Sequence, residues 1–283
     1  MTAAVLSGTA LAAQLRAGTA SRAAALAAAG RPPAVAVVTA TSDEGSAWYV
    51  ATIVKSAAKA AIECRVVDLG AAASERSIRS ALRELSDDPA VAGVILQTPV
   101  PDGLSAAALA AGIAPAKDID GANPLSLGRL SAGLPAFAPA TAEAVIRLLD
   151  FHQVALAGRD AVIVGRSVVV GKPLAQLLLS RDATVTVAHS RSRDLAHVTG
   201  RADVLVAAAG RAHLVTPAHV RPGAVIIDVG TNVTRQGALV GDVDPGVGAT
   251  AAAISPVPGG VGPVTTAVLL EHAVAAAEHA ASS

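Results

Sequence analysis

The sequence predicts an α/β protein of two domains, each with a mainly parallel sheet flanked by helices. Three observations predict this class. Short apolar runs rich in Val and Ile alternate with Ala/Leu/Arg stretches of helical length, the alternation restarts after a Pro/Gly-rich stretch at 124–139, and 283 residues suffice for two ordinary domains. Strands that alternate with helices form βαβ units, and parallel strands covered on both faces are apolar almost throughout.

The first half of the chain contains the first set of alternating elements. Strands are expected at 33–40, 64–70 and 91–101, and helices at 9–29, 46–62, 74–86 and 104–112. A last helical stretch, 265–281, ends the chain. We therefore expect a first domain over residues 1–138 that is completed by the helix at 265–283.

The second half predicts a Rossmann-like domain over residues 139–264. Strands are expected at 160–165, 183–189, 202–210 and 224–230. The first of them runs into Gly165, Gly171 follows six residues later, and a helix is expected near Pro173. Glycines at such a turn let backbone N–H groups approach a pyrophosphate at the helix N-terminus. The turn lacks the middle glycine of G-x-G-x-x-G and is not a P-loop, so a purely structural turn is the alternative.

The end of the next strand indicates which dinucleotide would bind. An NAD site usually places Asp or Glu there to hold the ribose 2′-hydroxyl. This chain has His189, Ser190 and Arg191 instead, and Arg166 lies in the turn after the preceding strand. A hydroxyl and two cations favour a 2′-phosphate, and hence NADP. The alternative is that these arginines are ordinary solvated loop residues.

Composition excludes several other classes. Lys and Arg, 22 in all, balance 22 Asp and Glu, so no electrostatic case exists for a nucleic-acid or anionic-membrane partner. The single Cys64 is typical of a reducing compartment, and we read neither a leader nor a membrane span, so we expect a cytoplasmic protein. The seven histidines are scattered without metal-ligand spacing, and no metal is expected. Apart from His189, they are interpreted as ordinary surface or capping residues.

Three features of the first domain are candidates for a substrate site. Gln97 stands at the carboxyl end of a predicted strand, where ligands bind in open α/β sheets. Asp118 and Asp120 share a short loop before Gly121, and the only Trp and Tyr of the chain, at 48 and 49, lie on a predicted helix. The alternatives are turn acids and an aromatic helix face.

Taken together, the motifs resemble one family over nearly the whole chain. They are S-x-x-Y-V at 46–50, G-V-I-L-Q-x-P-x-P at 93–101, P-x-K-D-x-D-G at 115–121, G-R-S-x-x-V-G-x-P at 165–173, D-V-G-x-N at 228–232, G-D-V at 241–243 and P-V-P-G-G-V-G-P-x-T at 256–265. In this order they are similar to the bifunctional methylenetetrahydrofolate dehydrogenase/methenyltetrahydrofolate cyclohydrolases, as a divergent member. The resemblance implies NADP-dependent oxidation of a methylene bridge on tetrahydrofolate, in one-carbon metabolism, by a homodimer.

The resemblance also implies roles for individual residues. Tyr49 would pack against the pterin and aminobenzoyl groups, Gln97 would belong to the catalytic hydrogen-bond set, and Asp120 would hold the amino-pyrimidine edge. The glycine-rich loop would lie along the ligand through Pro258, Gly259 and Gly260. The residues expected to contact NADP, with Gly171 and Arg191 added from the turn and charge patterns, are Gly165, Arg166, Ser167, Gly171, Ser190, Arg191 and Thr231.

One departure from the family pattern bears on activity. The family segment Y-V-x-x-K-x-K places its catalytic lysine four residues after the tyrosine, and this chain has Ile53 there. Lys55 and Lys59 lie about 240° and 80° around a helix from Tyr49, so neither replaces that lysine. We therefore expect a dehydrogenase with weak or absent cyclohydrolase activity. The folate-side segments at 40–41, 126 and 139–142 also depart from the pattern, which leaves open an altered substrate or a non-catalytic binding protein.

Overall fold

The computed structural model describes residues 3–234 and 236–282, and the chain divides into two compact units. One comprises residues 13–140 and 266–282, and we call it the three-stranded unit after its sheet. The other comprises residues 3–12 and 141–265 and is called the six-stranded unit. The division falls inside the two long helices α1 (Thr9–Ala28) and α9 (Val261–Ser282). The predicted α/β class with mainly parallel sheets is confirmed.

The three-stranded sheet has the order β3-β2-β4, and all its pairs are parallel. Its strands are β2 (Ala34–Thr39), β3 (Glu63–Asp68) and β4 (Gly93–Leu96). The shorter helices of this unit are α2 (Glu44–Lys59), α3 (Glu75–Asp87), α4 (Ala106–Ala110), η1 (Pro115–Lys117) and α5 (Pro124–Ser131). Since β3 and β4 flank β2, the chain order reverses at β2, and the loops after β2 and β4 share the carboxyl edge where ligands bind in such sheets.

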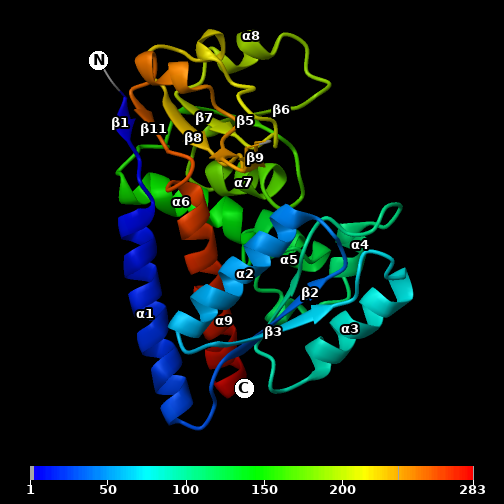
Figure 1. Ribbon diagram of the computed structural model, residues 1–283. Helices are drawn as coiled ribbons and strands as arrows, with labels where there is room; N and C mark the ends of the chain where they lie inside the picture. The colour runs from blue at the N-terminus through cyan, green and yellow to red at the C-terminus, as the bar shows by residue number, and fades with distance from the viewer. Residues whose placement is uncertain (1–2, 235, 283) are drawn as a thin grey trace. The chain divides into compact units, whose positions relative to one another are not determined.

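The six-stranded sheet is also parallel throughout. Its order is β1 (Ala4–Val5), β11 (Ala253–Ile254), β8 (Val225–Asp228), β7 (Val204–Ala207), β5 (Asp160–Val164) and β6 (Thr184–Ala188) (Figure 1). The helices are α6 (Ala140–Phe151), α7 (Gly171–Leu179), α8 (Leu195–Thr199), η2 (Pro217–His219) and η3 (Pro245–Ala249). A hairpin of β9 (Asn232–Val233) and β10 (Leu239–Val240) lies apart from the sheet.

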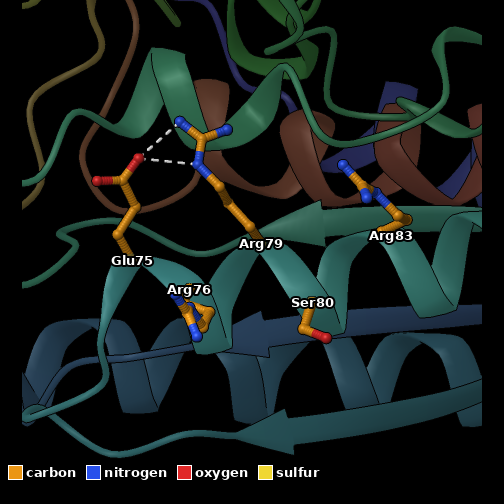
Figure 2. Close-up of a pocket in the computed structure, with 5 residues that line it drawn as sticks. All are labelled: Glu75, Arg76, Arg79, Ser80 and Arg83. Atoms are coloured by element: carbon orange, nitrogen blue, oxygen red, sulfur yellow. Dashed lines mark hydrogen bonds and ion pairs between the residues drawn. The ribbon is translucent and has the colours of Figure 1, made fainter.

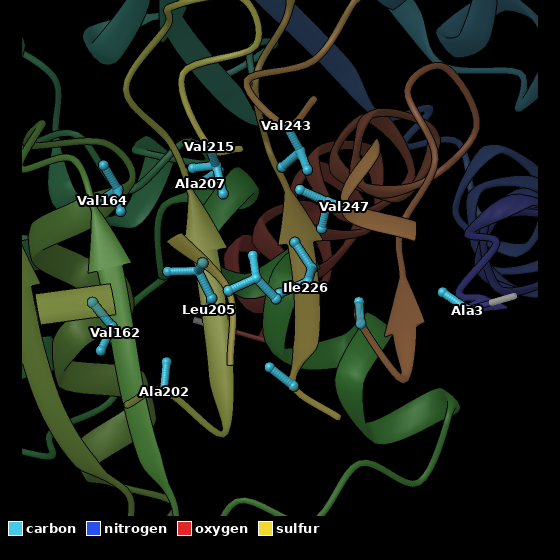
Figure 3. Packing of buried hydrophobic residues seen from close by; sticks show 13 residues of the cluster. Ala3, Val162, Val164, Ala202, Leu205, Ala207, Val215, Ile226, Val243 and Val247 are labelled. Atoms are coloured by element: carbon cyan, nitrogen blue, oxygen red, sulfur yellow. The ribbon is translucent and has the colours of Figure 1, made fainter. Parts of the chain in front are cut away.

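A core of small aliphatic side chains holds the six-stranded unit together. Figure 3 shows Val162 and Val164 on β5, Leu205 and Ala207 on β7 and Ile226 on β8 pointing to one face of the sheet. Side chains two apart on a strand share a face, so the strand residues that lie between these point to the opposite face of the sheet. The strand residues of β5, β7 and β8 are buried almost throughout, as expected for parallel strands covered on both sides.

Helix α2 illustrates how the sequence sets an element. Asp43 caps it, with its carboxylate 2.7 Å from the N–H of Ser46, and Lys59 in the last turn complements the helix dipole. Its buried residues are Ser46, Val50, Ile53 and Ala57, a spacing of four and three that forms one stripe. The stripe faces the interior, and the rest of the helix is more exposed.

Two parts of the chain differ from the sequence expectation. The Pro/Gly-rich stretch 124–139, where no helix is expected from the sequence, contains α5 in its first half, because Asn123 caps the helix through the N–H of Leu125 and Pro124 fits the first turn. Residues 3–12 belong to the six-stranded unit rather than to the first domain, because β1 pairs with β11. Strands of two residues are too short to show a periodic pattern. Within the described residues, no helix is long and apolar enough to cross a membrane.

Candidate active site

Tyr49 and Gln97 come from two elements at the carboxyl edge of the three-stranded sheet. Tyr49 lies on α2, and Gln97 directly follows β4. The carbonyl oxygen of Thr98 connects helix α2 to Gln97. It accepts a hydrogen bond from Ser46 Oγ on α2 at 2.9 Å and another from Gln97 Nε2 at 2.8 Å. Ser46 is buried, so this contact fixes the start of α2 on the loop after β4. Both predicted residues are half-buried, with part of each side chain open to solvent.

The two acids of the 118–120 loop have different surroundings. Asp118 is fully buried, and its carboxylate accepts the N–H groups of Ala122 and Asn123 at 2.9 Å each and a hydrogen bond from Ser126. These contacts close the loop onto the start of α5. Asp118 is therefore a structural acid, which agrees with the turn-acid alternative for this residue. Ser126, one of the positions that depart from the family pattern, supplies one of the donors.

Asp120 is the acid of this loop whose pKa lies near neutral pH. It accepts a hydrogen bond from the backbone N–H of Ala140, and burial together with the nearby carboxylate of Asp118 raises its pKa to about 7. Burial and then the negative charge of Asp120 raise the pKa of Tyr49 well above its usual value, while a hydrogen bond with Thr266 opposes that rise. The phenol thus stays neutral at physiological pH. The structure brings Tyr49 and Asp120 together, with Thr266 from α9 beside them.

The interpretation of the remaining histidines as surface or capping residues is correct for His219 and wrong for His272. His219 caps η2 through Thr216. His272 is only 5% exposed, with Nδ1 2.8 Å from the carbonyl oxygen of Ile119, and its charge acts on both Asp118 and Asp120. Its ring lies 4.8 Å from that of Phe137. Sequence reasoning missed it because nothing local links α9 to the 118–120 loop. The hint in the sequence is a histidine in a helical stretch made mostly of alanine, valine and leucine.

Ile53, which stands where the family resemblance leads one to expect a lysine, has no contact with solvent. Ile53 is fully buried in the stripe of α2 that faces the interior. Lys55 and Lys59 are exposed, about 200° around the helix from Ile53 and Ala57 respectively. In this structure neither ammonium group faces the side of α2 on which the expected lysine would stand.

The predicted dinucleotide turn lies where the chain order of the six-stranded sheet reverses. Gly165 directly follows β5, which has β6 on one side and β7 on the other. Gly165 has φ +135°, and a Cβ there would lie 2.1 Å from the carbonyl oxygen of Ala208. A Cβ on Gly171 would lie 2.2 Å from the carbonyl oxygen of Gly165. Both glycines are thus required by the close approach of backbone at the N-terminus of α7, which begins at Gly171 and has Pro173 in its first turn, as expected. Such a cradle fits a pyrophosphate.

The polar residues expected around NADP lie on two adjacent loops. Val164 and Ala188 are register partners at the ends of β5 and β6, so the turn after β5 and the loop after β6 share one edge. The predicted residues on these loops whose side chains are exposed are Arg166, Ser167, Ser190 and Arg191. Ser167 Oγ accepts the N–H of Val170 at 3.1 Å and so also shapes the turn.

Thr231 lies in a loop that two buried carboxylates hold. Asp228 accepts the N–H groups of Gly230, Asp242 and Val243. Asp242 accepts those of Ala209, Gly210 and Arg211, and Nδ2 of Asn232. The motifs D-V-G-x-N and G-D-V therefore lock together the loops after β7 and β8. Burial raises the pKa of Asp228, although these hydrogen bonds oppose the rise. Thr231 itself is exposed.

The glycine-rich loop ends where α9 begins, within the six-stranded unit. Pro258 is exposed, Gly259 is half-buried and Gly260 is buried. The carbonyl oxygen of Gly259 accepts the N–H of Gly8 at 2.8 Å, which ties the loop to the start of α1.

A surface depression of about 500 Å³ follows the outer side of α3. Figure 2 shows its lining residues, with Glu75 paired to Arg79 across one turn of the helix. The lining consists of Glu75, Arg76, Arg79, Ser80 and Arg83. None of the predicted site residues belongs to it. Among the described residues, no group of three or more His, Cys, Asp or Glu is placed to hold a metal ion.

The fold and the two sets of residues define a two-unit α/β protein with a glycine turn at the N-terminus of a helix in one unit and a cluster of polar side chains in the other. The family described as tetrahydrofolate dehydrogenase/cyclohydrolase matches the chain with its catalytic domain at residues 6–120 and with its NAD(P)-binding domain at residues 139–281. The chain belongs to this family.

Relatives and solved structures support the same placement. The chain is 55% identical to the bifunctional protein FolD of Nocardia farcinica over 274 residues, 96% of this chain and 97% of that protein. It is 61% identical to bifunctional protein FolD 1 of Saccharopolyspora erythraea over 229 residues, 81% of this chain and 78% of the other. The methylenetetrahydrofolate dehydrogenase-cyclohydrolase of Trypanosoma brucei, solved with NADP cofactor and an inhibitor, has a TM-score of 0.94 at 32% identity, with both chains fully covered. FolD from Campylobacter jejuni has a TM-score of 0.93 at 35% identity, covering 97% of this chain and 98% of that one.

Proposed function

We propose that the protein is an NADP-dependent methylenetetrahydrofolate dehydrogenase whose cyclohydrolase activity is weak or absent. Family membership over both domains supports the dehydrogenase. The single observation that separates the two activities is the fully buried Ile53 at the position of the family lysine. The three-stranded unit would hold the folate and the six-stranded unit the NADP.

The folate residues of the three-stranded unit have chemistry suited to a pterin. An ionised carboxylate at Asp120 accepts hydrogen bonds from a donor-rich amino-pyrimidine edge, and the Tyr49 ring packs on a flat, polarizable ligand. The Gln97 amide is oriented by the Thr98 carbonyl, so its oxygen is free to accept from the ligand. From the family resemblance we also assign Pro258, Gly259 and Gly260, which belong to the six-stranded unit, to contacts with the ligand.

The NADP residues of the six-stranded unit divide into backbone and charge contacts. Gly165, Ser167 and Gly171 would present the turn to the pyrophosphate, and Thr231 would add a hydroxyl from the neighbouring loop. Arg166, Ser190 and Arg191 would hold the 2′-phosphate. When bound, the nicotinamide supplies the hydride acceptor for the methylene carbon, and the protein aligns the two rings.

Ile53 affects the two reactions unequally. Cyclohydrolysis adds water to the methenyl carbon and opens the ring, which needs proton transfers at a positioned group. Such general acid–base help is worth roughly 10²–10⁴-fold, and an isoleucine supplies none. Hydride transfer depends on alignment, which Tyr49, Gln97 and Asp120 still provide.

A paired assay on the wild type and Ile53→Lys tests the proposal. One measurement follows NADPH formation from methylenetetrahydrofolate, and the other follows loss of the methenyl chromophore against the buffer rate. We expect NADPH from the wild type, and a methenyl loss that only the Lys variant accelerates, by up to about 10²-fold. Ile53→Met is the matched control, since it keeps the length and apolar character without the amine.

Other outcomes would distinguish the alternatives. A wild type that hydrolyses methenyltetrahydrofolate at rates typical of the family would overturn the loss of the second activity. Binding of NADP and tetrahydrofolate without NADPH formation would favour a non-catalytic binding protein. Binding of NADP alone would favour an oxidoreductase on an altered substrate.

We also propose a cytoplasmic homodimer without nucleic-acid or membrane partners. The edge strand β3 supports self-association, because most of its residues are exposed and Val66 remains 42% exposed, whereas β4 at the other edge is buried throughout. Exposed edges invite pairing with another chain. Light scattering of the purified protein would distinguish a dimer from a monomer. The one cysteine, Cys64, and the balanced charge support the rest.

A further inference from the structure

His272 occupies a defined place against the 118–120 loop. Its ring is packed against Phe137, with centroids 4.8 Å apart and the planes inclined by 34°. Nδ1 lies 2.8 Å from the carbonyl oxygen of Ile119, the residue between the two acids of the loop. With 5% of its surface exposed, the side chain is fixed by α9 on one side and by the loop on the other.

The partner of Nδ1 determines where the second proton binds. A carbonyl oxygen only accepts hydrogen bonds, so Nδ1 carries a proton and donates it to Ile119. The imidazole therefore becomes charged by protonation at Nε2, without loss of this contact.

The two acids that flank Ile119 differ in how fully they are stabilised as anions. Asp118 has hydrogen bonds from Ala122, Asn123 and Ser126. For Asp120 the one hydrogen bond identified is the N–H of Ala140, and it also meets the repulsion of Asp118. Asp120 is thus the acid whose ionisation depends more on a neighbouring positive charge. His272 supplies such a charge, which lowers the pKa of both carboxyls.

We propose that His272 is a positioning residue of the folate site, where its imidazolium keeps Asp120 in the ionised form that binds the amino-pyrimidine edge. This inference rests on the proposed function, since it assigns Asp120 to the folate. The charged or titratable groups that act on Asp120 in the described residues are Asp118 in the same loop, Tyr49 on α2 and His272 on α9. Tyr49 stays neutral, so His272 is the group of this set that can offset the charge of Asp118.

The sign of the effect follows from these charges. With a pKa of about 7, Asp120 gains a proton as the pH falls below 7, and folate affinity falls with it. Removing the imidazolium raises the pKa of Asp120 further. The curve of folate affinity against pH then moves to higher pH, and near pH 7 the affinity falls by up to about tenfold. At a pH well above the pKa of Asp120 in both proteins, the wild type and the variant without the imidazolium bind folate with equal affinity.

The test compares the wild type with His272→Asn, and uses tetrahydrofolate as the probe at a series of pH values. Asn places an amide N–H near the Nδ1 position, so the contact with Ile119 and the fold are kept while the titrating ring is lost. His272→Gln serves the same purpose if the Asn variant does not fold. His279→Asn is the matched control, because His279 is an exposed histidine on the same helix. We expect the affinity curve to shift for His272→Asn and to stay in place for His279→Asn.

A second readout needs no folate. Infrared titration follows the band of the protonated carboxyl of Asp120, identified by its loss in Asp120→Asn. We expect this band to persist to higher pH in His272→Asn. An unshifted band, or an affinity reduced equally at every pH, would overturn the inference. A shifted band in a protein that forms no NADPH would instead overturn the proposed dehydrogenase and leave the role of His272 intact.

Discussion

The two units build their candidate sites in different ways. In the six-stranded unit the cofactor turn is made by backbone: Gly165 and Gly171 allow a close approach, and the buried Asp228 and Asp242 hold the neighbouring loops by their N–H groups. In the three-stranded unit the candidate site is made by side chains. There Tyr49 from α2, Asp120 from the loop after η1 and His272 from α9 interact.

The difference teaches which parts of a site tolerate change. A turn that depends on missing Cβ atoms loses its shape with any added side chain, whereas a cluster of side chains is altered one function at a time. The substitution of the family lysine by Ile53 is a change of the second kind, since α2 keeps its buried stripe. We therefore expect activities in the three-stranded unit to separate, and the shape of the glycine turn in the six-stranded unit to be kept or lost as a whole.

The largest effect is expected for Gly165→Ala. The new Cβ would lie 2.1 Å from the carbonyl oxygen of Ala208, at a φ of +135° that alanine rarely adopts, so the ends of β5 and β7 must move apart. We expect the Kd for NADP, measured by calorimetry, to rise at least about 100-fold, the equivalent of about 3 kcal/mol.

Gly248→Ala is the control in the same unit, because no atom lies within 4 Å of a Cβ at that position. It should bind NADP as the wild type does. An affinity of Gly165→Ala within a few-fold of the wild type would show that the turn does not set the cofactor site.

The next effect is expected for Asp120→Asn. A neutral amide replaces the carboxylate, and hydrogen bonds to a charged group are worth about 1.5–3 kcal/mol each. We expect the KM for methylenetetrahydrofolate to rise about 10- to 100-fold while the Kd for NADP stays the same. Asp102→Asn, an exposed acid of the same unit, should leave both constants unchanged. A parallel loss of NADP affinity would contradict the separation between the two sites.

A smaller effect is expected for Arg191→Ala. Loss of one exposed cation on the loop after β6 weakens a 2′-phosphate contact, so the Kd for NADP should rise about tenfold while that for NAD changes little. Arg193→Ala removes an equal charge two residues further on, and it is exposed too. Equal losses in the two variants, or an equal loss for NAD, would mean that general positive charge and not a phosphate contact is involved. Fluorescence titration with NADPH and NADH distinguishes these outcomes.

The contrast between the sites also explains what the sequence could predict. The strand positions and the Gly165–Gly171 turn follow from local patterns, since apolar runs and glycine spacing reflect the backbone around them. The pairing of Thr266 with Tyr49 and of His272 with the 118–120 loop depends on how α9 packs, and no local pattern encodes that. Asp118 and Asp120 lie two residues apart and have the same side chain. Only their burial and hydrogen-bond partners in the fold distinguish Asp118, which holds the loop, from Asp120, whose pKa lies near neutral pH.

The smallest effect is expected for Tyr49→Phe, which separates the ring of Tyr49 from its hydroxyl. The variant loses the hydrogen bond with Thr266, worth about 0.5–1.5 kcal/mol, and keeps the apolar face for the pterin. We expect the free energy of unfolding in urea to fall by about that amount and the KM for methylenetetrahydrofolate to rise only a few-fold. Trp48→Phe is the control on the same helix, because Trp48 is 61% exposed, and it should change neither quantity.

If the KM of Tyr49→Phe instead rises as much as that of Asp120→Asn, the hydroxyl acts together with the carboxylate. The side chains of the three-stranded unit would then form one coupled site, as tightly constrained as the glycine turn.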